Sequence, residues 1–587
     1  MGALGLSLLS SSCSVVVNDF PEQCQTNRDC EELAAKQPLN PDGTRVSGLI
    51  CTEEHVCELK GCRSNAECQD ANEGEPYLCR KSDRTCQPMI LKSPDDPETN
   101  ICDVLADPDD FRNESTIWIG ADVIFAPGSW QGLELVRQDF NKPTPTLPPA
   151  TATGRDNRPL GFVYCEADPE ITPGAEASPG HLVDTLELPI VITSLDTSSE
   201  IALLQDYSLK ADPPVFQVST SAGGERLKTI DNQDMLVDLV LINENYPKET
   251  RELLENYYLD HLRTTGHLGA DETPRVAVIH SSTATYSSLS VSMLTELRAS
   301  SAIGNRDDVR DFGYGDTDNP SGSPAEYPGV VRDVLEFKPH LIVILGDEEI
   351  GPSEETMSDG IDVPIEAGWG DAAGDQPRPL WLGILGTVGQ IPKDMRTLDT
   401  AAQLEWGSRT LFIQQHYDFE GDFFTDYYTQ LEQLLNGNDP NDVLGTEKSS
   451  PYNEFLREGA YLTAYSIALV AANGLPMTGP NVAAAARGFG RDKTTHFPIG
   501  PNDIFRALQH IRDTGESFIL DQFQGWTHFD ENGFAQYPFA DDVACLTAEE
   551  DPDTMMTAVG ALQPTGGIFD HDGVLTGVVL PDGCVTP

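Results

Sequence analysis

The sequence predicts an α/β protein with two lobes, each a doubly wound parallel sheet, preceded by a small disulfide-rich region. Three observations support this fold class. The chain has 587 residues, a length typical of about two to four domains. From Thr116 onward, short apolar runs alternate with helical patterns, as in βαβ units. Ten of the 13 cysteines lie within the first 102 residues, which sets that region apart from the lobes.

Composition and charge exclude several functions. The chain carries 95 Asp and Glu against 37 Lys and Arg, a formal net charge of -58. Such a surface repels nucleic acids and anionic membranes, so we expect no nucleic-acid partner. No segment approaches the ~18 consecutive apolar residues of a transmembrane helix. We therefore expect a soluble globular chain that meets a membrane only through a lipid anchor.

The first 13 residues predict export. The segment 1–12 is uncharged, contains four leucines and ends in serines before Cys13. It resembles the end of a bacterial lipoprotein signal, in which such a cysteine is lipidated and becomes the mature terminus. This resemblance implies a lipid on Cys13 and a location in the periplasm or at the cell surface, anchored to a bacterial membrane. The alternative is an ordinary short apolar leader with a spare thiol. Either version delivers the chain to an oxidising compartment.

The region 14–102 contains two four-cysteine modules, at 24–57 and 62–86. Few apolar residues fill the spacers, so each module needs a substitute for a core, and we predict two disulfides in each. Zinc is the alternative, although the close cysteine pairs are five or six residues apart rather than two to four. Four cysteines allow three pairings, which the sequence leaves open. Parity predicts a Cys545–Cys584 pair in the tail and a Cys102–Cys165 pair in the first lobe. The twelve disulfide candidates are Cys24, Cys30, Cys51, Cys57, Cys62, Cys68, Cys79, Cys86, Cys102, Cys165, Cys545 and Cys584.

Apolar runs and helical periodicity predict the elements of the lobes. In the first set, strands are predicted at 117–125, 161–165, 188–192 and 215–218, followed by a helix over 249–265. In the second set, we predict strands at 275–280, 340–345 and 380–384, a helix over 289–297, and a long core helix over 453–473 that ends at Gly474. The segments 304–326 and 351–379 are rich in Gly, Pro and Asp, and we interpret them as surface loops.

Three segments resemble type I periplasmic binding proteins, the family of branched-chain amino-acid receptors. They are Pro189–Ile201, Val278–Tyr286 and Phe523–Gly533, the last with the pattern F-x-G-x-x-x-F-D-x-N-G. The resemblance covers about residues 115–537. It implies two doubly wound parallel sheets joined by a hinge, with a ligand bound between the lobes. It places 115–270 and 416–518 in lobe 1, 274–410 and 519–540 in lobe 2, and 541–587 in a C-terminal extension.

The resemblance also implies ligand-binding residues at the strand ends. They are Thr193, Ser194, Thr197, Ser219, Ser221, Tyr286 and Asp347. Hydroxyl groups can donate to and accept from a small polar solute, and a tyrosine after the first strand of lobe 2 closes over the ligand in this family. The alternative for Thr193, Ser194 and Thr197 is that they cap the helix that follows.

The second lobe departs from the receptors at one position. An acidic side chain commonly receives the ligand's ammonium group there, whereas this chain has Leu385. Asp347 and Glu348 offer acids from an adjacent loop, although charged turns on so acidic a chain are usually only solvated. We therefore expect a small polar solute, such as an amino acid, an amide or a similar molecule, without specifying it further.

Motifs for catalysis and for metals are missing from the sequence. It contains no G-x-S-x-G, H-E-x-x-H or G-x-x-x-x-G-K-[ST] pattern, so we expect no enzyme, no cofactor and no metal site. Asp530–Gly533 and Asp570–Gly573 lack the twelve-residue loop of an EF-hand and favour hairpin turns. We interpret His280, His416 and His528, beside predicted strands, as structural.

Two functions follow from these patterns. The first is a lipid-anchored extracytoplasmic solute-binding protein that delivers its ligand to an ABC-type permease or a sensor. The second is a non-catalytic surface or periplasmic interaction scaffold whose cleft is vestigial. The intact order of the fold elements favours the first function, and the missing ligand residues favour the second.

Overall fold

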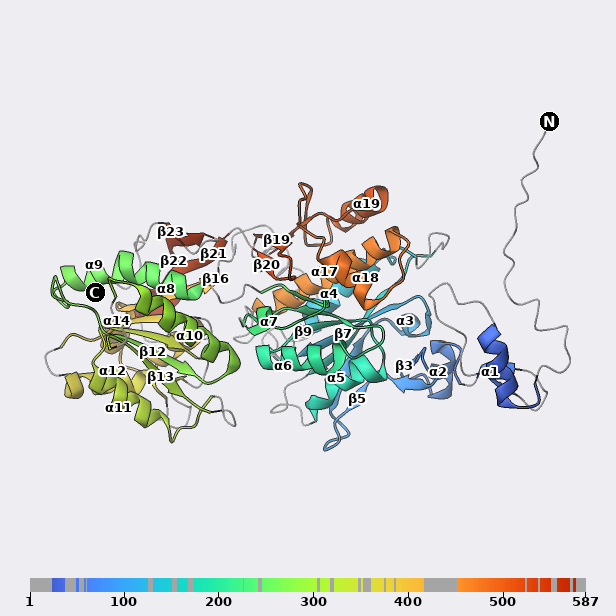
Figure 1. The fold of residues 1–587 in the computed structure, drawn as a ribbon, viewed down its shortest axis with the longest axis horizontal. Helices are drawn as coiled ribbons and strands as arrows, with labels where there is room; N and C mark the ends of the chain where they lie inside the picture. The colour runs from blue at the N-terminus through green and yellow to red at the C-terminus, as the bar shows by residue number, and fades with distance from the viewer. Residues whose placement is uncertain are drawn as a thin grey trace.

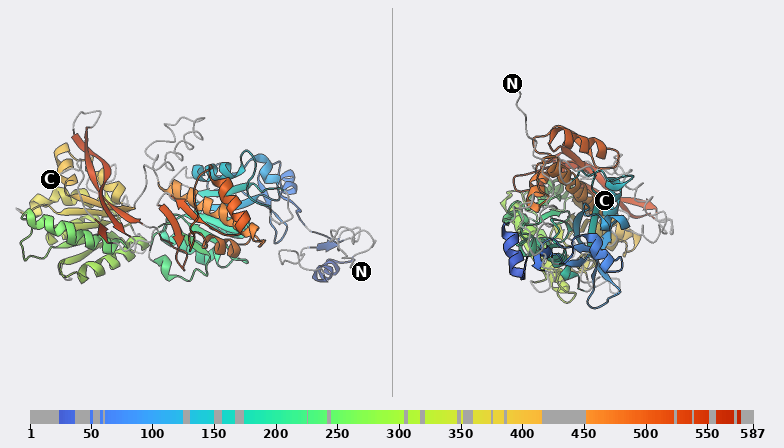
Figure 2. Two further views of the ribbon diagram at one scale, coloured as in Figure 1. Left: turned by 90° about the horizontal axis from the view of Figure 1, so that it is seen from above. Right: turned by 90° about the vertical axis from the view of Figure 1, so that its right-hand side faces the viewer.

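The computed structural model shows two α/β lobes side by side, with the N-terminal modules at the outer end of the first lobe (Figures 1 and 2). It describes residues 24–36, 49–51, 57–59, 61–124, 130–149, 156–166, 174–224, 226–240, 245–303, 307–316, 321–346, 350–351, 360–373, 376–384, 387–415, 451–522, 525–536, 539–550, 557–570 and 574–576. Cys13 and the rest of the predicted lipoprotein signal lie outside these residues.

Each cysteine module is one helix and one hairpin held by two disulfides. The first contains α1 (Asn27–Lys36), β1 (Leu49–Cys51) and β2 (Cys57–Leu59), and the second contains α2 (Asn65–Ala71), β3 (Tyr77–Cys79) and β4 (Cys86–Pro88). The bonds are Cys24–Cys51, Cys30–Cys57, Cys62–Cys79 and Cys68–Cys86. Both modules therefore join their first cysteine to the third and the second to the fourth. The disulfide prediction is confirmed for these eight cysteines, and the zinc alternative is wrong.

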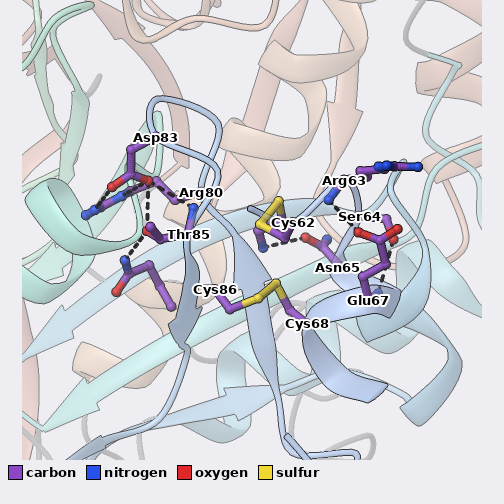
Figure 3. Close-up of a disulfide and its surroundings, with 12 residues drawn as sticks. Cys62, Arg63, Ser64, Asn65, Glu67, Cys68, Arg80, Asp83, Thr85 and Cys86 are labelled. Atoms are coloured by element: carbon purple, nitrogen blue, oxygen red, sulfur yellow. Dashed lines mark hydrogen bonds and ion pairs between the residues drawn. A yellow bond between two sulfur atoms is a disulfide. The ribbon is translucent and has the colours of Figure 1, made fainter. Parts of the chain in front are cut away.

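Hydrogen bonds at the start of α2 orient the second module (Figure 3). The Ser64 hydroxyl accepts from the Glu67 amide at 3.1 Å, and Glu67 Oε2 accepts from the Arg63 amide at 2.6 Å. Ser64 is thus the N-cap of α2, and Glu67 binds the amide of the residue that precedes this cap. The hairpin register places Cys79 directly opposite Cys86, so both hairpin cysteines face the helix that carries Cys68. The two disulfides thus take the place of a hydrophobic core.

Polar contacts fix the second module to the first lobe. Arg112 Nη1 lies 2.7 Å from Asp70 Oδ1. On the opposite side of the module, Ser82 donates a hydrogen bond to Glu187, and Arg80 lies near backbone carbonyls of the same segment. Figures 1 and 2 show the second module against the first lobe and the first module farther out. Within the described residues, the second module is therefore attached to the first lobe.

The first lobe is a seven-stranded sheet in the order β11-β10-β9-β7-β8-β6-β5. Its strands are β5 (Leu91–Lys92), β6 (Asn100–Leu105), β7 (Ile117–Val123), β8 (Leu160–Glu166), β9 (Ile190–Ser194), β10 (Phe216–Ser219) and β11 (Leu236–Asp238). The strands from β11 to β8 are parallel, and β6 is antiparallel to β8. Cys102 and Cys165 are direct partners across β6 and β8 and form the predicted disulfide.

Helices cover both faces of this sheet (Figure 1). One face packs against α4 (Trp130–Asn141), α17 (Pro451–Ala472), α18 (Gly479–Ala486) and α19 (Ile504–Thr514). The other face packs against α5 (Ser178–Gly180), the π-helical turns η2 (His181–Thr185) and η3 (Leu203–Ser208), and α6 (Thr197–Ala202). The short helices α3 (Pro108–Arg112) and α7 (Arg226–Thr229) lie in the connections. This two-sided burial explains why the central strands are almost entirely apolar.

The second lobe repeats this architecture with an eight-stranded sheet, β13-β12-β14-β15-β16-β21-β22-β23. Its strands are β12 (Val276–Ser281), β13 (Val309–Tyr314), β14 (Leu341–Leu345), β15 (Leu380–Ile384), β16 (Thr410–Gln415), β21 (Phe539–Glu550), β22 (Thr557–Asp570) and β23 (Leu575–Thr576). Helices α8 (Tyr246–Leu253), α9 (Leu259–Thr264) and α10 (Ala284–Ala299), with the turn η4 (Leu254–Tyr258), cover one face. Helices α11 (Tyr327–Phe337), α12 (Asp362–Ala373), α13 (Thr387–Met395) and α14 (Thr400–Gly407) cover the other.

The structure corrects the predicted boundaries between the lobes. Residues 246–264 pack in the core of the second lobe rather than the first. Residues 519–536 belong to the first lobe, because β18 (Ile519–Gln522), β19 (Gly525–Phe529) and β20 (Ala535–Gln536) form a small sheet with β17 (His496–Pro498) and bury Phe529 and Phe534 there. Strands β5 and β6 extend the first sheet into the predicted cysteine-rich region. The predicted C-terminal extension supplies β21 to β23, and β21 is antiparallel to β16.

Two predicted loops also contain regular structure. The segment 304–326 includes the edge strand β13, and the segment 351–379 includes α12. The predicted helix over 453–473 is confirmed as α17, and Gly474 follows it with a positive φ of 66°. The predicted late hairpin is confirmed as β19 and β20. Among the helices described, none is long and apolar enough to cross a membrane.

Candidate ligand-binding site between the lobes

The two lobes meet at the carboxyl edges of their sheets. Helix α6 follows β9 of the first lobe, and α10 follows β12 of the second. The hydroxyl oxygens of Thr197 in α6 and Thr285 in α10 lie 3.1 Å apart, within hydrogen-bond distance. Crevices outside the carboxyl ends of parallel strands are the usual ligand sites of such sheets. This hydroxyl pair therefore marks the candidate site.

On the first-lobe side, Asp196 rather than a predicted hydroxyl residue caps α6. Its carboxylate accepts hydrogen bonds from the amides of Ser198 at 2.7 Å and Ser199 at 3.1 Å. The alternative that Thr193, Ser194 or Thr197 caps this helix is therefore wrong. The Thr197 hydroxyl is free of that role and points across to the second lobe, where it contacts Thr285.

On the second-lobe side, hydroxyl groups and an imidazole gather at the end of β12. The hydroxyl oxygens of Ser281 and Thr283 lie 2.9 Å apart and form a hydrogen bond. His280 Nε2 lies 2.9 Å from Asp311 Oδ1, and its Nδ1 lies 2.7 Å from the Ser281 carbonyl oxygen. Both ring nitrogens therefore lie within hydrogen-bond distance of an oxygen atom. Hydrogen bonding to His280 lowers the pKa of Asp311, so this edge holds a carboxylate beside the imidazole as well as hydroxyls.

The structure separates several residues that the sequence predicted to act together on a ligand. Thr193, Ser194 and Ser219 are fully buried inside the first lobe. Ser221 is half-buried, and its hydroxyl donates to the Leu195 carbonyl oxygen at 2.7 Å. Tyr286 is buried and packs in the core of the second lobe. Asp347 lies outside the described residues. Of the six predicted residues that the structure describes, Thr197 makes the printed contact between the lobes.

A buried polar layer behind this edge was missed by sequence reasoning. Asp122, Thr193, Ser219 and Asp238 stand on β7, β9, β10 and β11, and each is the register partner of the next. We call these four residues the polar row. Side chains at matching positions of neighbouring strands lie on one face of a sheet. Glu200 of α6 joins them, because its Oε1 accepts a hydrogen bond of 2.8 Å from the Thr193 hydroxyl.

The carboxyl groups of this layer hold their protons more tightly than usual. The pKa of Glu200 is raised to about 8, mainly by burial. The nearby charge of Asp122 also raises this pKa, whereas two hydrogen bonds to the carboxyl group lower it. Burial likewise raises the pKa of Asp122 to about 7 and that of Asp238 well above its ordinary value. Desolvation disfavours the ionised form of each acid, so these carboxyls stay protonated to a higher pH than exposed ones.

Within the described part of the chain, the groups of side chains spaced closely enough to hold a metal ion are two clusters of cysteine sulfurs near the amino terminus. Cys24, Cys30 and Cys51 form one such cluster, and Cys62, Cys68 and Cys79 form the other. All six sulfurs are in disulfides, so they do not offer thiolates to a metal. Cys545 is also disulfide-bonded, and its predicted partner Cys584 lies outside the described residues.

A surface hollow of about 740 Å³ lies elsewhere on the first lobe. It is lined by the loop Gly490–Lys493 and by the turn of the β19–β20 hairpin. In that turn, Asp530 Oδ1 accepts from the amides of Asn532 at 2.8 Å and Phe534 at 3.0 Å. The carboxylate thus stabilises the turn, as predicted, and the hollow is an open surface depression distinct from the Thr197–Thr285 contact. The predicted turn at 570–573 and His416 lie largely outside the described residues.

Comparisons with known proteins concern the fold. No protein-family model matches the chain, and no curated protein matches its sequence. A solute-binding protein of an ABC transporter from Rhodopseudomonas palustris HaA2, in complex with p-hydroxybenzoic acid, is 12% identical with a TM-score of 0.47, over 78% of this chain and 97% of that one. A periplasmic binding protein type 1 from Bordetella pertussis Tohama I is 13% identical with a TM-score of 0.47, over 76% and 100%. An extracellular ligand-binding receptor from Verminephrobacter eiseniae is 13% identical with a TM-score of 0.44, over 79% and 100%.

The arrangement of the two sheets agrees with the fold predicted from the sequence. Each lobe is a largely parallel sheet covered on both faces, and their carboxyl edges face each other at Thr197 and Thr285. The chain passes between the lobes after β11, after β16 and after β20. The chain therefore consists of two α/β lobes, each built on a largely parallel sheet with helices on both faces, as the sequence predicts.

Proposed function

We propose that the chain is an extracytoplasmic solute-binding protein that captures a small polar ligand between its lobes. The observation that carries this proposal is the pair of threonine hydroxyls, 3.1 Å apart, at the facing carboxyl edges of two separate sheets. Sites of this kind orient a small molecule through a few convergent polar groups. The ligand would then pass to an ABC-type permease or a sensor, with no chemistry performed by the chain itself.

Hinged movement would couple binding to the relative position of the lobes. Three connections join the lobes, and the Thr197–Thr285 hydrogen bond is a further contact between them. A ligand that bonds to both hydroxyls would replace this direct contact and favour the conformation that presents both edges to it. Hydroxyls both donate and accept, so we propose an uncharged or zwitterionic polar solute.

The disulfides support a location outside the cytoplasm. Five complete disulfides are present in the described residues, and such bonds persist in oxidising compartments. We propose the periplasm or the cell surface, with a lipid on Cys13 as the anchor. Mass spectrometry of the protein purified from a bacterial host would detect that lipid, and a water-soluble mature chain without it would contradict the anchor.

Thermal melting of the full chain tests the ligand proposal. The probes are amino acids, amides, short peptides, sugars, polyamines and aromatic carboxylates. A ligand of the folded state raises the melting temperature in proportion to RT ln(1 + [L]/Kd). We expect at least one class to do so, and we expect Thr197→Val and Thr285→Val, which keep the side-chain shape but lose the hydroxyl, to reduce the shift.

The matched control is Thr229→Val, an exposed first-lobe threonine that bonds only within its own helix turn at Arg226. It should leave the shift unchanged. Tyr286 is unsuited as a probe because it packs in the second-lobe core. A folded protein that responds to none of the probes, or a shift insensitive to both valine variants, would sink the proposal.

A second candidate function is a protein-interaction scaffold with a vestigial cleft. The burial of Tyr286 in a core and of Thr193 against Glu200 favours it, because both side chains are engaged within their own lobes. The outward position of the first cysteine module (Figure 2) gives such a scaffold a surface to present. A silent ligand screen, together with a partner complex that survives Thr197→Val but is lost when residues 24–59 are removed, would support this function.

A further inference from the structure

The three connections between the lobes meet the second lobe close to one another. Helix α8 begins at Tyr246 after the first connection, β16 ends at Gln415 before the second, and β21 begins at Phe539 after the third. Gln415 and Asp541 are register partners across β16 and β21. Tyr246 forms a hydrogen bond with Asp541, which brings α8 to the same place. Side chains at these three ends can therefore influence how the lobes move.

Two buried carboxyl groups form a hydrogen bond at this place. Glu249 lies in the first turn of α8 and is 0% exposed, and Asp541 lies near the start of β21 and is 3% exposed. An ionised carboxylate can only accept, so the hydrogen bond between these groups requires a proton on one of the two. This shared proton joins the segment that follows the first connection to the segment that follows the third. We call Glu249 and Asp541 the hinge pair.

Acidic and uncharged groups act on the hinge pair from its own two elements. The groups that act most strongly on Asp541, besides Glu249, are Tyr246, which donates a hydrogen bond, and the acidic Asp542. Lys248 stands next to Glu249 on α8 but is not among these groups. Within the described residues of α8 and β21, the hinge pair therefore has no strong positive charge to balance it.

The neighbouring strands carry amides and an acid at the adjacent register positions. Gln414 and Gln415 are at the end of β16, and Asp570 of β22 lies opposite the residue two positions before Asp541. Burial and the contact with Glu249 raise the pKa of Asp541 well above its ordinary value. Removal of the shared proton would leave two adjacent negative charges away from water, and such charges repel each other strongly.

We propose that the hinge pair is a proton-dependent clamp that sets how freely the two lobes move. With its proton, the pair holds α8 against β21, so the first and third connections leave the second lobe from fixed positions. Without the proton, the two carboxylates repel each other, and both connections gain freedom. Higher pH should therefore loosen the hinge. The clamp acts without a ligand, so it goes beyond the proposed function and is tested separately from it.

A second buried carboxyl pair in the same lobe provides a matched control. Asp362 is 0% exposed and Asp394 is 2% exposed, and the two are hydrogen-bonded to each other. Their helices, α12 and α13, contact each other on one face of the sheet, and neither begins or ends at a connection between the lobes. Asp394→Asn thus alters a similar pair that does not adjoin the hinge.

Distances between two spin labels in the full chain, measured by pulsed electron resonance without ligand at about pH 6 and about pH 9, test the clamp. Noncanonical amino acids carry the labels, which leaves the disulfides intact. They replace Lys210 in the first lobe and Arg332 in the second, whose side chains are 64% and 66% exposed. The wild type should give one narrow distance peak at the lower pH and a broader distribution at the higher pH. Glu249→Gln keeps a donor for Asp541 but lacks the second charge, so its peak should stay narrow at both.

The control Asp394→Asn should broaden with pH as the wild type does. Circular dichroism at both pH values checks folding, and Asp541→Asn serves as a second variant if Glu249→Gln does not fold. A wild-type distribution that is the same at both pH values would overturn the proposal. So would a folded Glu249→Gln chain that broadens as the wild type does, because the pair would then act on stability alone. Loss of the broadening in Asp394→Asn would also overturn it, because ionisation of any buried pair would then loosen the lobe.

Discussion

Replacing Glu200 by Gln should change how the stability of the first lobe depends on pH. The pKa of this carboxyl rises from an ordinary 4.5 to about 8 in the folded chain, mainly through burial. Between these values the folded state holds a proton that the unfolded state releases. Stability therefore falls as pH rises through this window. Gln cannot ionise, so the variant should lack this part of the pH dependence.

The expected magnitude follows from the two pKa values. A difference of one pKa unit corresponds to about 1.36 kcal/mol. The step from 4.5 to about 8 thus corresponds to about 5 kcal/mol as an upper limit, with most of it lost by pH 8. Asp122 and Glu200 repel each other, so the Gln variant should also let Asp122 ionise more easily. We expect wild type and variant to be similar near pH 4.5 and the variant to be more stable at pH 8.

Urea unfolding between pH 4.5 and pH 8.5 would measure this difference. Hydrogen exchange of peptides from β9 and α6 would assign the transition to the first lobe. Parallel pH profiles for the two chains, within about 0.5 kcal/mol, would refute the burial of an uncompensated acid at this position.

Three further predictions concern the stability of the fold. Replacing both Cys102 and Cys165 by Ala removes a disulfide that closes a loop with a sequence separation of 63. The free energy of unfolding should fall by about 4 kcal/mol, because the unfolded chain gains entropy. An unchanged urea midpoint would contradict this prediction. Gly479→Ala should destabilise the first lobe by about 1–3 kcal/mol, because the added Cβ would collide with neighbouring backbone atoms. Gly370→Ala has open space around the added Cβ and should stabilise α12 by about 0.5–1 kcal/mol. Equal melting temperatures for the two variants would argue against this packing. Burial lowers the pKa of His340 to about 4, so the stability of the folded chain should fall as pH drops from about 6.5 towards 4. His340→Gln should flatten the plot of melting temperature against pH in that range. An unaltered slope would show that His340 is solvated.

Fold prediction succeeded where strands are buried on both faces. The runs around Ile117, Leu341 and Leu380 are continuous apolar segments, and each is a central strand. It failed for β13, which is an edge strand with exposed polar residues such as Arg310 and Asp311. It also failed for α12, where interior glycines and an aspartate-rich context imitate a loop. The lobe boundaries were misplaced because the sequence does not indicate which sheet the helices at 246–264 will cover, nor which lobe the hairpin within 519–536 will join.

Prediction of the candidate site was limited by register. Thr197 lies at the carboxyl edge of the sheet, as the sequence predicts. This position follows from its place just after a parallel strand and does not depend on which strands are its neighbours. Asp122 and Asp238 were missed because each is a single acid in an apolar run. Only the alignment of four strands brings them into one layer with Glu200. Glu200 lies within the segment Pro189–Ile201 that the sequence singled out, but its burial depends on the packing of α6 against the sheet.

The attachment of the second cysteine module to one lobe determines which part of the molecule moves. Arg112 and Asp70 join this module to the first lobe, and the first module extends the chain from there towards its N-terminus (Figure 1). If the N-terminus is held at a membrane, the first lobe becomes the stationary half, and any hinge rotation displaces the second lobe relative to that membrane. A membrane partner would then detect ligand occupancy as the position of the second lobe, not as a change within the anchored one.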